Sequence, residues 1–131
     1  MERRGCMSLD KSTRDDIEKA LRPIASLIGK SEKAQQKLAP GTWQHTMLLG
    51  NLKALRIATA LMNQESDDLV SIAPDDLKEA LRALDSMIKR SEKAWGKFSP
   101  GTSQHTLQRN RIQALEIASE LVGKTLEASE S

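Results

Sequence analysis

Apolar residues recur along this chain at alternating spacings of four and three, which is the pattern of one buried helical stripe. Over residues 14–38 the stripe positions are Ile17, Leu21, Ile24, Ile28, Ser31, Gln35 and Leu38. Over residues 74–98 the same register gives Leu77, Leu81, Leu84, Ile88, Ser91, Trp95 and Phe98. We therefore predict two helices, one over each of these ranges.

A second apolar stripe follows each of these predicted helices. It contains Met47, Leu48, Leu52, Leu55, Ala58, Leu61 and Met62 in the first half, and Leu107, Ile112, Leu115, Ala118, Leu121 and Val122 in the second. Gly123 is expected to end the last helix. Aromatic residues make up only 2% of the chain, which disfavours sheet, so the pattern predicts an all-α protein of four helices.

The two halves of the chain repeat one another at a distance of sixty residues. Aligned without a gap, residues 15–63 and 75–123 are identical at 23 of 49 positions. This predicts a single domain over 1–131, with internal repeat 1 at about 13–63 and internal repeat 2 at about 73–123.

The ends of the predicted helices carry signals of their own. Thr13 precedes an acidic first turn and is expected to cap the first helix. Pro23 lies inside that helix, and we predict a kink there because proline lacks a backbone donor and clashes with the preceding turn. Outside the helices, the tails at 1–11 and 124–131 are expected to be flexible.

The two helices of each repeat are joined through the same sequence, Pro-Gly-Thr. The structural turn residues are Pro40, Gly41 and Thr42 in the first repeat, and Pro100, Gly101 and Thr102 in the second. Glycine can adopt the left-handed conformation that closes a helix, and threonine can cap the helix that follows. A connection this short makes each repeat an antiparallel αα-hairpin.

A single αα-hairpin leaves one apolar face in water. Packing the two hairpins together covers both faces, which predicts a four-helix up-down-up-down bundle built from two tandemly duplicated αα-hairpins. The short connector between the repeats favours an order in which both Pro-Gly-Thr turns lie at one end of the bundle. Exchange of hairpins between two chains would use the same surfaces and remains an alternative.

The chain has two histidines, His45 and His105, and both follow a turn in a Gln-His-Thr motif. Glu32 and Glu92 lie near the ends of the preceding helices. If both turns share one end of the bundle, two imidazoles and two carboxylates could approach one another. Such a set would suit Zn²⁺ or another divalent ion.

The turn residues also have a purely structural interpretation, which we favour. Thr42 would cap the second helix, while Gln44 and His45 would hydrogen-bond the end of the first. No catalytic residue is assigned in this interpretation, and no cofactor is expected.

The two tryptophans occupy different positions in the two repeats. Trp43 is replaced by Ser103, and Trp95 stands where the first repeat has Gln35. These positions face each other across a hairpin, so each repeat is predicted to fill one space in the core with one indole. The alternative is an exposed aromatic contact for a partner.

Composition limits the classes of protein to which this chain can belong. Charged residues make up 29% of the chain, but the net charge is only +2, without the clustered basic excess of a nucleic-acid-binding surface. No run approaches the roughly 18 apolar residues needed to cross a membrane. The N-terminal residues lack the apolar stretch of a secretory signal, and the single cysteine, Cys6, fits a reducing compartment. We therefore expect a cytoplasmic protein with neither a membrane nor a nucleic-acid partner.

Motifs for catalysis are missing from the sequence. It has no glycine-rich phosphate loop, no cysteine pair and no His-Glu-x-x-His, so no enzyme is expected. The predicted function is a non-enzymatic protein-interaction or structural module. It would bind a protein partner, or associate with itself as a homodimer through leftover apolar positions such as Leu49 and Ile57. The alternative is a small-ligand or divalent-metal site at the hairpin-turn end.

Overall fold

The computed structural model describes residues 9–63 and 72–130 of the chain. Four helices account for most of these residues: α1 (Leu9–Gln36), α2 (Trp43–Met62), α4 (Pro74–Trp95) and α5 (Ser103–Glu130). No strand occurs in the two described ranges. The prediction of an all-α protein whose helices pack together as a four-helix bundle is confirmed.

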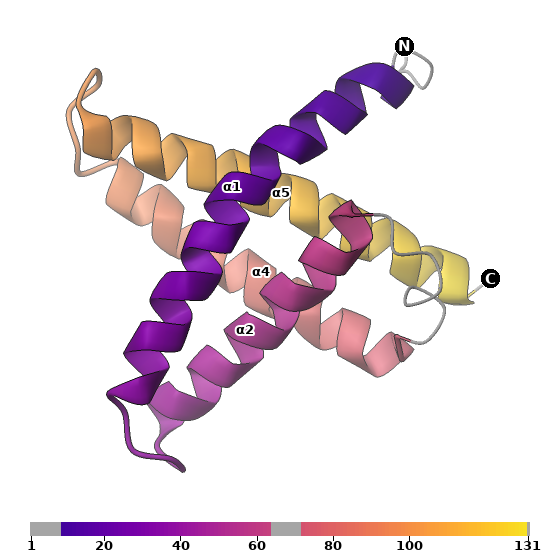
Figure 1. Ribbon diagram of the computed structural model, residues 1–131, viewed down its shortest axis with the longest axis horizontal. Coiled ribbons are helices and arrows are strands. Elements are labelled where there is room, and N and C mark those ends of the chain that lie inside the picture. The colour runs from indigo at the N-terminus through magenta and orange to yellow at the C-terminus, as the bar shows by residue number, and fades with distance from the viewer. Residues whose placement is uncertain (1–8, 64–71, 131) are drawn as a thin grey trace.

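The helices pair into two hairpins that cross one another (Figure 1). Helix α1 pairs with α2 and α4 with α5, while α2 packs against both helices of the second hairpin and α1 packs across α5. The turn between α1 and α2 and the turn between α4 and α5 lie at different corners of the molecule (Figure 1). Both turns lie on the same side of the molecule, to the left in Figure 1, but at separate corners, so they are not adjacent as the expectation of a shared end implied.

The distribution of buried residues explains why the hairpins cross. The fully buried side chains of α1 and α4 end at Ile24 and Leu84, well before the turns, where the stripe positions become polar or partly exposed. The hairpins thus have no continuous apolar seam up to their turns. They pack together only where both are apolar, and their turn-proximal ends diverge.

Equivalent positions of the two repeats are buried in the core. Equivalent buried pairs are Ile17 and Leu77, Ala20 and Ala80, Ile24 and Leu84, Ala54 and Ala114, Leu55 and Leu115, and Ala58 and Ala118. The predicted stripe is correct at Ile17 and Ile24 but misses Ala20, which is buried while Leu21 lies at the edge of the core. Small alanines at these sites let the crossing helices approach closely.

Two predicted helix ends are wrong. Helix α1 already begins at Leu9, so Thr13 lies inside it instead of capping it. Helix α5 runs past Gly123 to Glu130, so residues 124–130, expected to be a flexible tail, form the end of a helix. Leu126 packs against the core, and this tertiary contact outweighs the poor helix propensity of one glycine. Residues 1–8 of the predicted N-terminal tail and residue 131 lie outside the described residues.

Pro23 lies inside α1, which continues as one helix on both sides of it. The axis of α1 changes direction part-way along its length (Figure 1). A bend is the expected response of a helix to an internal proline.

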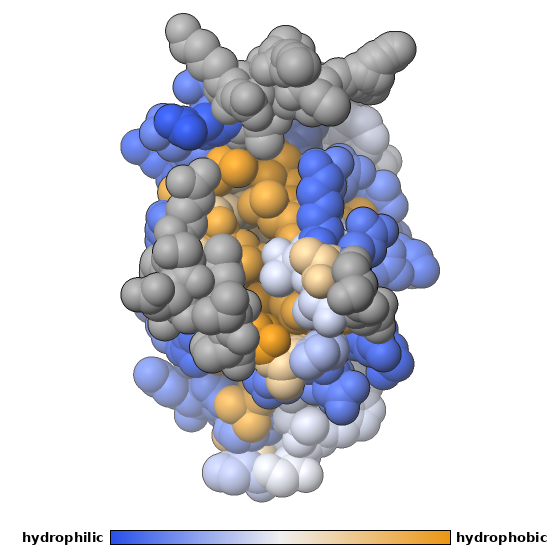
Figure 2. All heavy atoms as spheres, turned by 90° about the vertical axis from the view of Figure 1, so that its right-hand side faces the viewer, coloured by the Kyte–Doolittle hydropathy of each residue, from blue (hydrophilic) through white to orange (hydrophobic). Residues whose placement is uncertain are grey.

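The side of the molecule opposite the two turns carries an apolar, hollowed strip between hydrophilic flanks (Figure 2). None of the four helices, over the residues described, is long and apolar enough to cross a bilayer.

Candidate functional site

The Pro-Gly-Thr turns have the same geometry in both repeats. Gly41 and Gly101 adopt φ angles of 90° and 89°, in the left-handed region that only glycine enters readily. The Thr42 hydroxyl accepts a hydrogen bond from the backbone N–H of His45 at 3.3 Å and donates one to the carbonyl of Ala39 at 2.9 Å. Thr42 thus joins the start of α2 to the end of the preceding turn.

The second repeat forms the same contacts. Thr102 accepts from the N–H of His105 at 3.2 Å and donates to the carbonyl of Ser99 at 2.8 Å. In both repeats the contribution of the histidine to the cap is its backbone N–H. The imidazole is therefore not needed for the cap.

The four candidate metal ligands are not brought together. Glu32 accepts a hydrogen bond from Arg56 Nη2 at 2.7 Å across the first hairpin. The ring of His105 packs against Trp95, with ring centroids 5.0 Å apart and planes inclined by 36°. His45 and Glu92 belong to different hairpins, whose turns are at different corners (Figure 1). Within the described ranges, no three His, Cys, Asp or Glu side chains form a group that could hold a metal ion.

The prediction that the tryptophans fill the core is wrong. The side chain of Trp43 is 68% exposed and that of Trp95 is 37% exposed. Both lie near the turns, where the two hairpins diverge (Figure 1) and the buried core does not extend. Among the residues whose burial the structure describes, the large exposed apolar residues lie in these turn-proximal regions. We call them the hairpin-tip residues: Trp43, Leu49, Trp95, Phe98 and Leu107.

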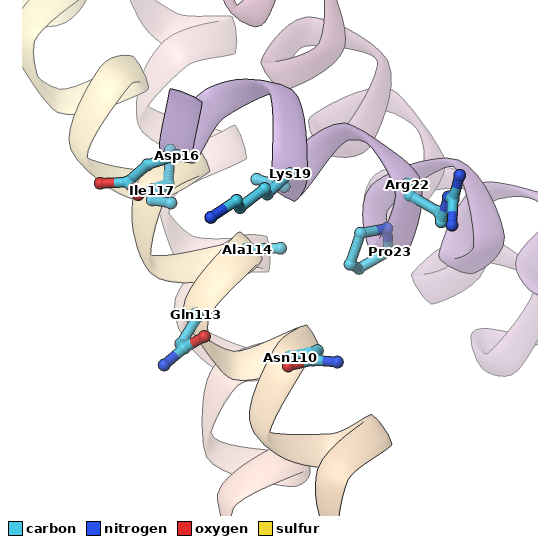
Figure 3. A pocket seen from close by; sticks show the side chains of 9 residues that line it. Asp16, Lys19, Arg22, Pro23, Asn110, Gln113, Ala114 and Ile117 are labelled. Atoms are coloured by element: carbon cyan, nitrogen blue, oxygen red, sulfur yellow. The ribbon is translucent and has the colours of Figure 1, made fainter. Parts of the chain in front are cut away.

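A groove of about 340 Å³ lies between α1 and α5. Its walls include polar residues of both helices, namely Asp16, Lys19 and Arg22 of α1 and Asn110 and Gln113 of α5 (Figure 3). The remaining lining residues are Ala20, Pro23, Ala114 and Ile117. Lys19 reaches from α1 toward α5, whereas Arg22 lies farther along α1 (Figure 3).

A second hollow of about 410 Å³ adjoins this groove, and we call it the acidic pocket. It shares part of its lining with the groove but has a different charge. Its lining residues are Asp16, Gln113, Glu116, Ile117 and Glu120. Three of the five carry a carboxylate and none is basic, so the acidic pocket favours a cation.

The equivalent seam between α2 and α4 is closed by a side-chain contact. Lys53 Nζ donates a hydrogen bond to Asp76 Oδ1 at 2.8 Å. This hydrogen bond and the negative charge of Asp76, aided by the charge of Glu79, raise the pKa of the Lys53 ammonium. In the α1–α5 seam the same two positions hold Gln113 and Asp16. The sequence contained this difference, but it could be interpreted only once the two seams were known to be equivalent.

Comparison of the chain with protein-family models, with curated proteins and with solved structures found no match.

Arg111 is a polar residue that the sequence pattern did not single out. It occupies the position of Asn51, which is itself buried in the first repeat. The Nε and Nη2 atoms of Arg111 are buried and find no hydrogen-bond acceptor among the described residues. Burial also lowers the pKa of this guanidinium. A buried donor without an acceptor costs free energy, so we expect Arg111 to destabilise the fold.

Proposed function

We propose that the protein is a non-enzymatic interaction module that binds a protein partner through its hairpin-tip residues. The observation that carries this proposal is the 68% exposed indole of Trp43. Tryptophan provides a large, rigid apolar surface and is among the residue types that dominate the energetics of protein interfaces. Covering an exposed indole with a partner favours binding, because it removes apolar surface from water.

The repeat itself indicates that the fold does not need this indole. The second repeat has Ser103 at the same position and forms the same turn, with the same cap. Trp43 is thus not required for closing the hairpin, and its exposure leaves it little part in packing. A role in binding accounts for it better.

The partner can be another protein or a second copy of this chain, as in a homodimer. The single cysteine, Cys6, supports a reducing compartment, and the proposal places the module in the cytoplasm.

The variant Trp43→Ser tests this function, because it introduces the residue that the other repeat carries. We expect it to lose the proteins that the wild-type chain captures from native lysate, or the self-association that sedimentation velocity measures. Its midpoint of thermal unfolding should stay close to that of the wild type, since the indole is exposed.

The matched control is Gln44→Ser, which changes an exposed polar neighbour in the same turn. It should retain every interaction of the wild type. If Trp43→Ser and Gln44→Ser both bind as the wild type does, the proposed function is wrong.

A further inference from the structure

Positive charge is concentrated near the two Pro-Gly-Thr turns. We call residues 30–50 and 90–110, which contain all the hairpin-tip residues, the first and second hairpin tips. The first tip carries a formal charge of +2 and the second one of +3, and each contains a single carboxylate. Since the whole chain carries only +2, the rest of it carries −3. The exposed apolar side chains thus lie in the basic part of the molecule.

Two lysines of each hairpin tip occupy matched positions in the two repeats. Lys33 lies in the last turn of α1, and Lys37 lies in the turn that leads to Trp43. Their equivalents in the second tip are Lys93 and Lys97. All four lysines are exposed, and none of them forms an ion pair with another described residue. Their charges are therefore available to a partner.

Carboxylates that could neutralise these lysines are scarce in the neighbouring sequence. Neither residues 33–64 nor residues 93–115 include an aspartate or a glutamate. Glu32, the carboxylate of the first tip, accepts a hydrogen bond from Arg56 Nη2 at 2.7 Å. It is therefore already paired with a cation other than Lys33 or Lys37.

We propose that the partner protein presents an acidic amphipathic segment to the first hairpin tip. Its apolar side chains would cover the indole of Trp43, and its carboxylates would pair with Lys33 and Lys37. Opposite charges across an interface speed encounter and orient the two surfaces. This inference rests on the proposed function, in which Trp43 is the centre of the binding surface, and it adds the chemistry of the partner.

The modest charge of the tip favours a protein segment over other anionic partners. Basic clusters that hold anionic lipids contain roughly four to eight Lys or Arg side chains. Nucleic-acid-binding surfaces show a larger clustered basic excess, because they neutralise several phosphates. The first tip combines Lys33 and Lys37 with one widely exposed indole. This combination matches a short segment with a few carboxylates and one apolar face.

The probe is a capped synthetic peptide in which the sequence Glu-Leu-Glu-Glu-Leu-Leu-Glu is written twice, so that its leucines share one face of a helix. It is titrated into Trp95→Gln protein, in which Trp43 is the only indole and Gln is the residue that the first repeat has at this position. We expect a saturable shift of the tryptophan emission to shorter wavelength, because the indole leaves water. The same peptide with Gln in place of every Glu should bind at least fivefold more weakly.

The decisive variant is the double substitution Lys33→Gln and Lys37→Gln. It should weaken binding of the acidic peptide about fivefold, the scale of two exposed ion pairs. The matched control is Lys19→Gln with Lys124→Gln, which removes the same charge at exposed positions outside both tips. This control should bind the peptide as the wild type does. Both double variants should keep the midpoint of thermal unfolding of the wild type.

Several results would overturn the proposal. One is equal binding of the acidic peptide and its Gln analogue, and another is equal weakening by the two double variants, which would indicate a general charge effect. Absence of a saturable shift would also refute it. If vesicles of phosphatidylglycerol or a single-stranded oligothymidylate shift the emission and the peptide does not, the tip binds a different anion and the proposal is wrong.

Failure of this inference can be told apart from failure of the proposed function. If Trp43→Ser loses the interactions of the wild type while Lys33→Gln with Lys37→Gln retains them in full, the tip binds through apolar contact alone. Only the acidic character of the partner is then wrong. If Trp43→Ser retains these interactions, the proposed function and this inference both fail.

Discussion

Arg111 is a residue whose burial is expected to destabilise the fold. Two of its guanidinium nitrogens are buried without an acceptor, while its equivalent in the first repeat is the shorter and uncharged Asn51. An arginine does not give up its proton in proteins, so the charge and its donors remain in the partly buried site. An apolar side chain of similar length would fill the same space without this cost.

We therefore predict that Arg111→Met raises the free energy of unfolding by about 1 kcal/mol. Chemical denaturation followed by circular dichroism measures the change. Arg109→Met, at an exposed position of the same helix, should alter stability by less than about 0.5 kcal/mol. A loss of stability in Arg111→Met would show that the guanidinium contributes to the fold.

At the scale of single elements, glycine stabilises the turns of this fold but destabilises its helices. Gly41 has a φ of 90°, which an L side chain rarely adopts. Gly50 lies inside α2, where an added Cβ would meet nothing within 4 Å. The same substitution should therefore have opposite signs at the two positions.

We predict that Gly41→Ala lowers the free energy of unfolding by about 1 kcal/mol or more, because it places a side chain in the left-handed region. Gly50→Ala should raise it by up to about 1 kcal/mol through better helix propensity. Thermal and denaturant unfolding of the two variants would measure whether the free energy of unfolding falls in Gly41→Ala and rises in Gly50→Ala. Equal effects at both sites would contradict this account of the turn.

The helices and turns were predictable because their signals are local. Apolar spacing identified the four helices of the described residues, and the Pro-Gly-Thr sequence identified the two turns within the hairpins. The start of α1 and the end of α5 were not predictable from local signals. At the end of α5, for example, the contact of Leu126 with the core extends the helix beyond the stop signal at Gly123.

The crossing of the hairpins could not be predicted either. It depends on where Ala20 and its equivalents permit close approach, and spacing alone does not reveal this. The arrangement of the hairpins was needed to recognise that Trp43 is exposed. It was also needed to see that Gln113 and Lys53 occupy equivalent seams.

At the scale of the whole molecule, each hairpin depends on the other for burial. Leu55 and Leu115 are both fully buried, and α2 packs against both helices of the second hairpin. A hairpin on its own would expose these residues. Two helices also provide too little apolar burial to offset the conformational entropy lost on folding.

We accordingly predict that residues 1–64, expressed alone, do not unfold cooperatively as a monomer. Differential scanning calorimetry and circular dichroism at high dilution would test this, with the full chain as the control. A sharp, concentration-independent transition in the isolated half would show that one repeat is an independent domain.

The separation of the two turns has a consequence for assembly. Side chains suited to recognition stand at two remote corners, so a single binding protein could not easily cover both. If each corner engages its own target, the molecule is bivalent, and it would hold two targets apart as a spacer. Where the two targets are themselves linked, the second attachment becomes intramolecular, which raises the avidity of the complex without strengthening either attachment.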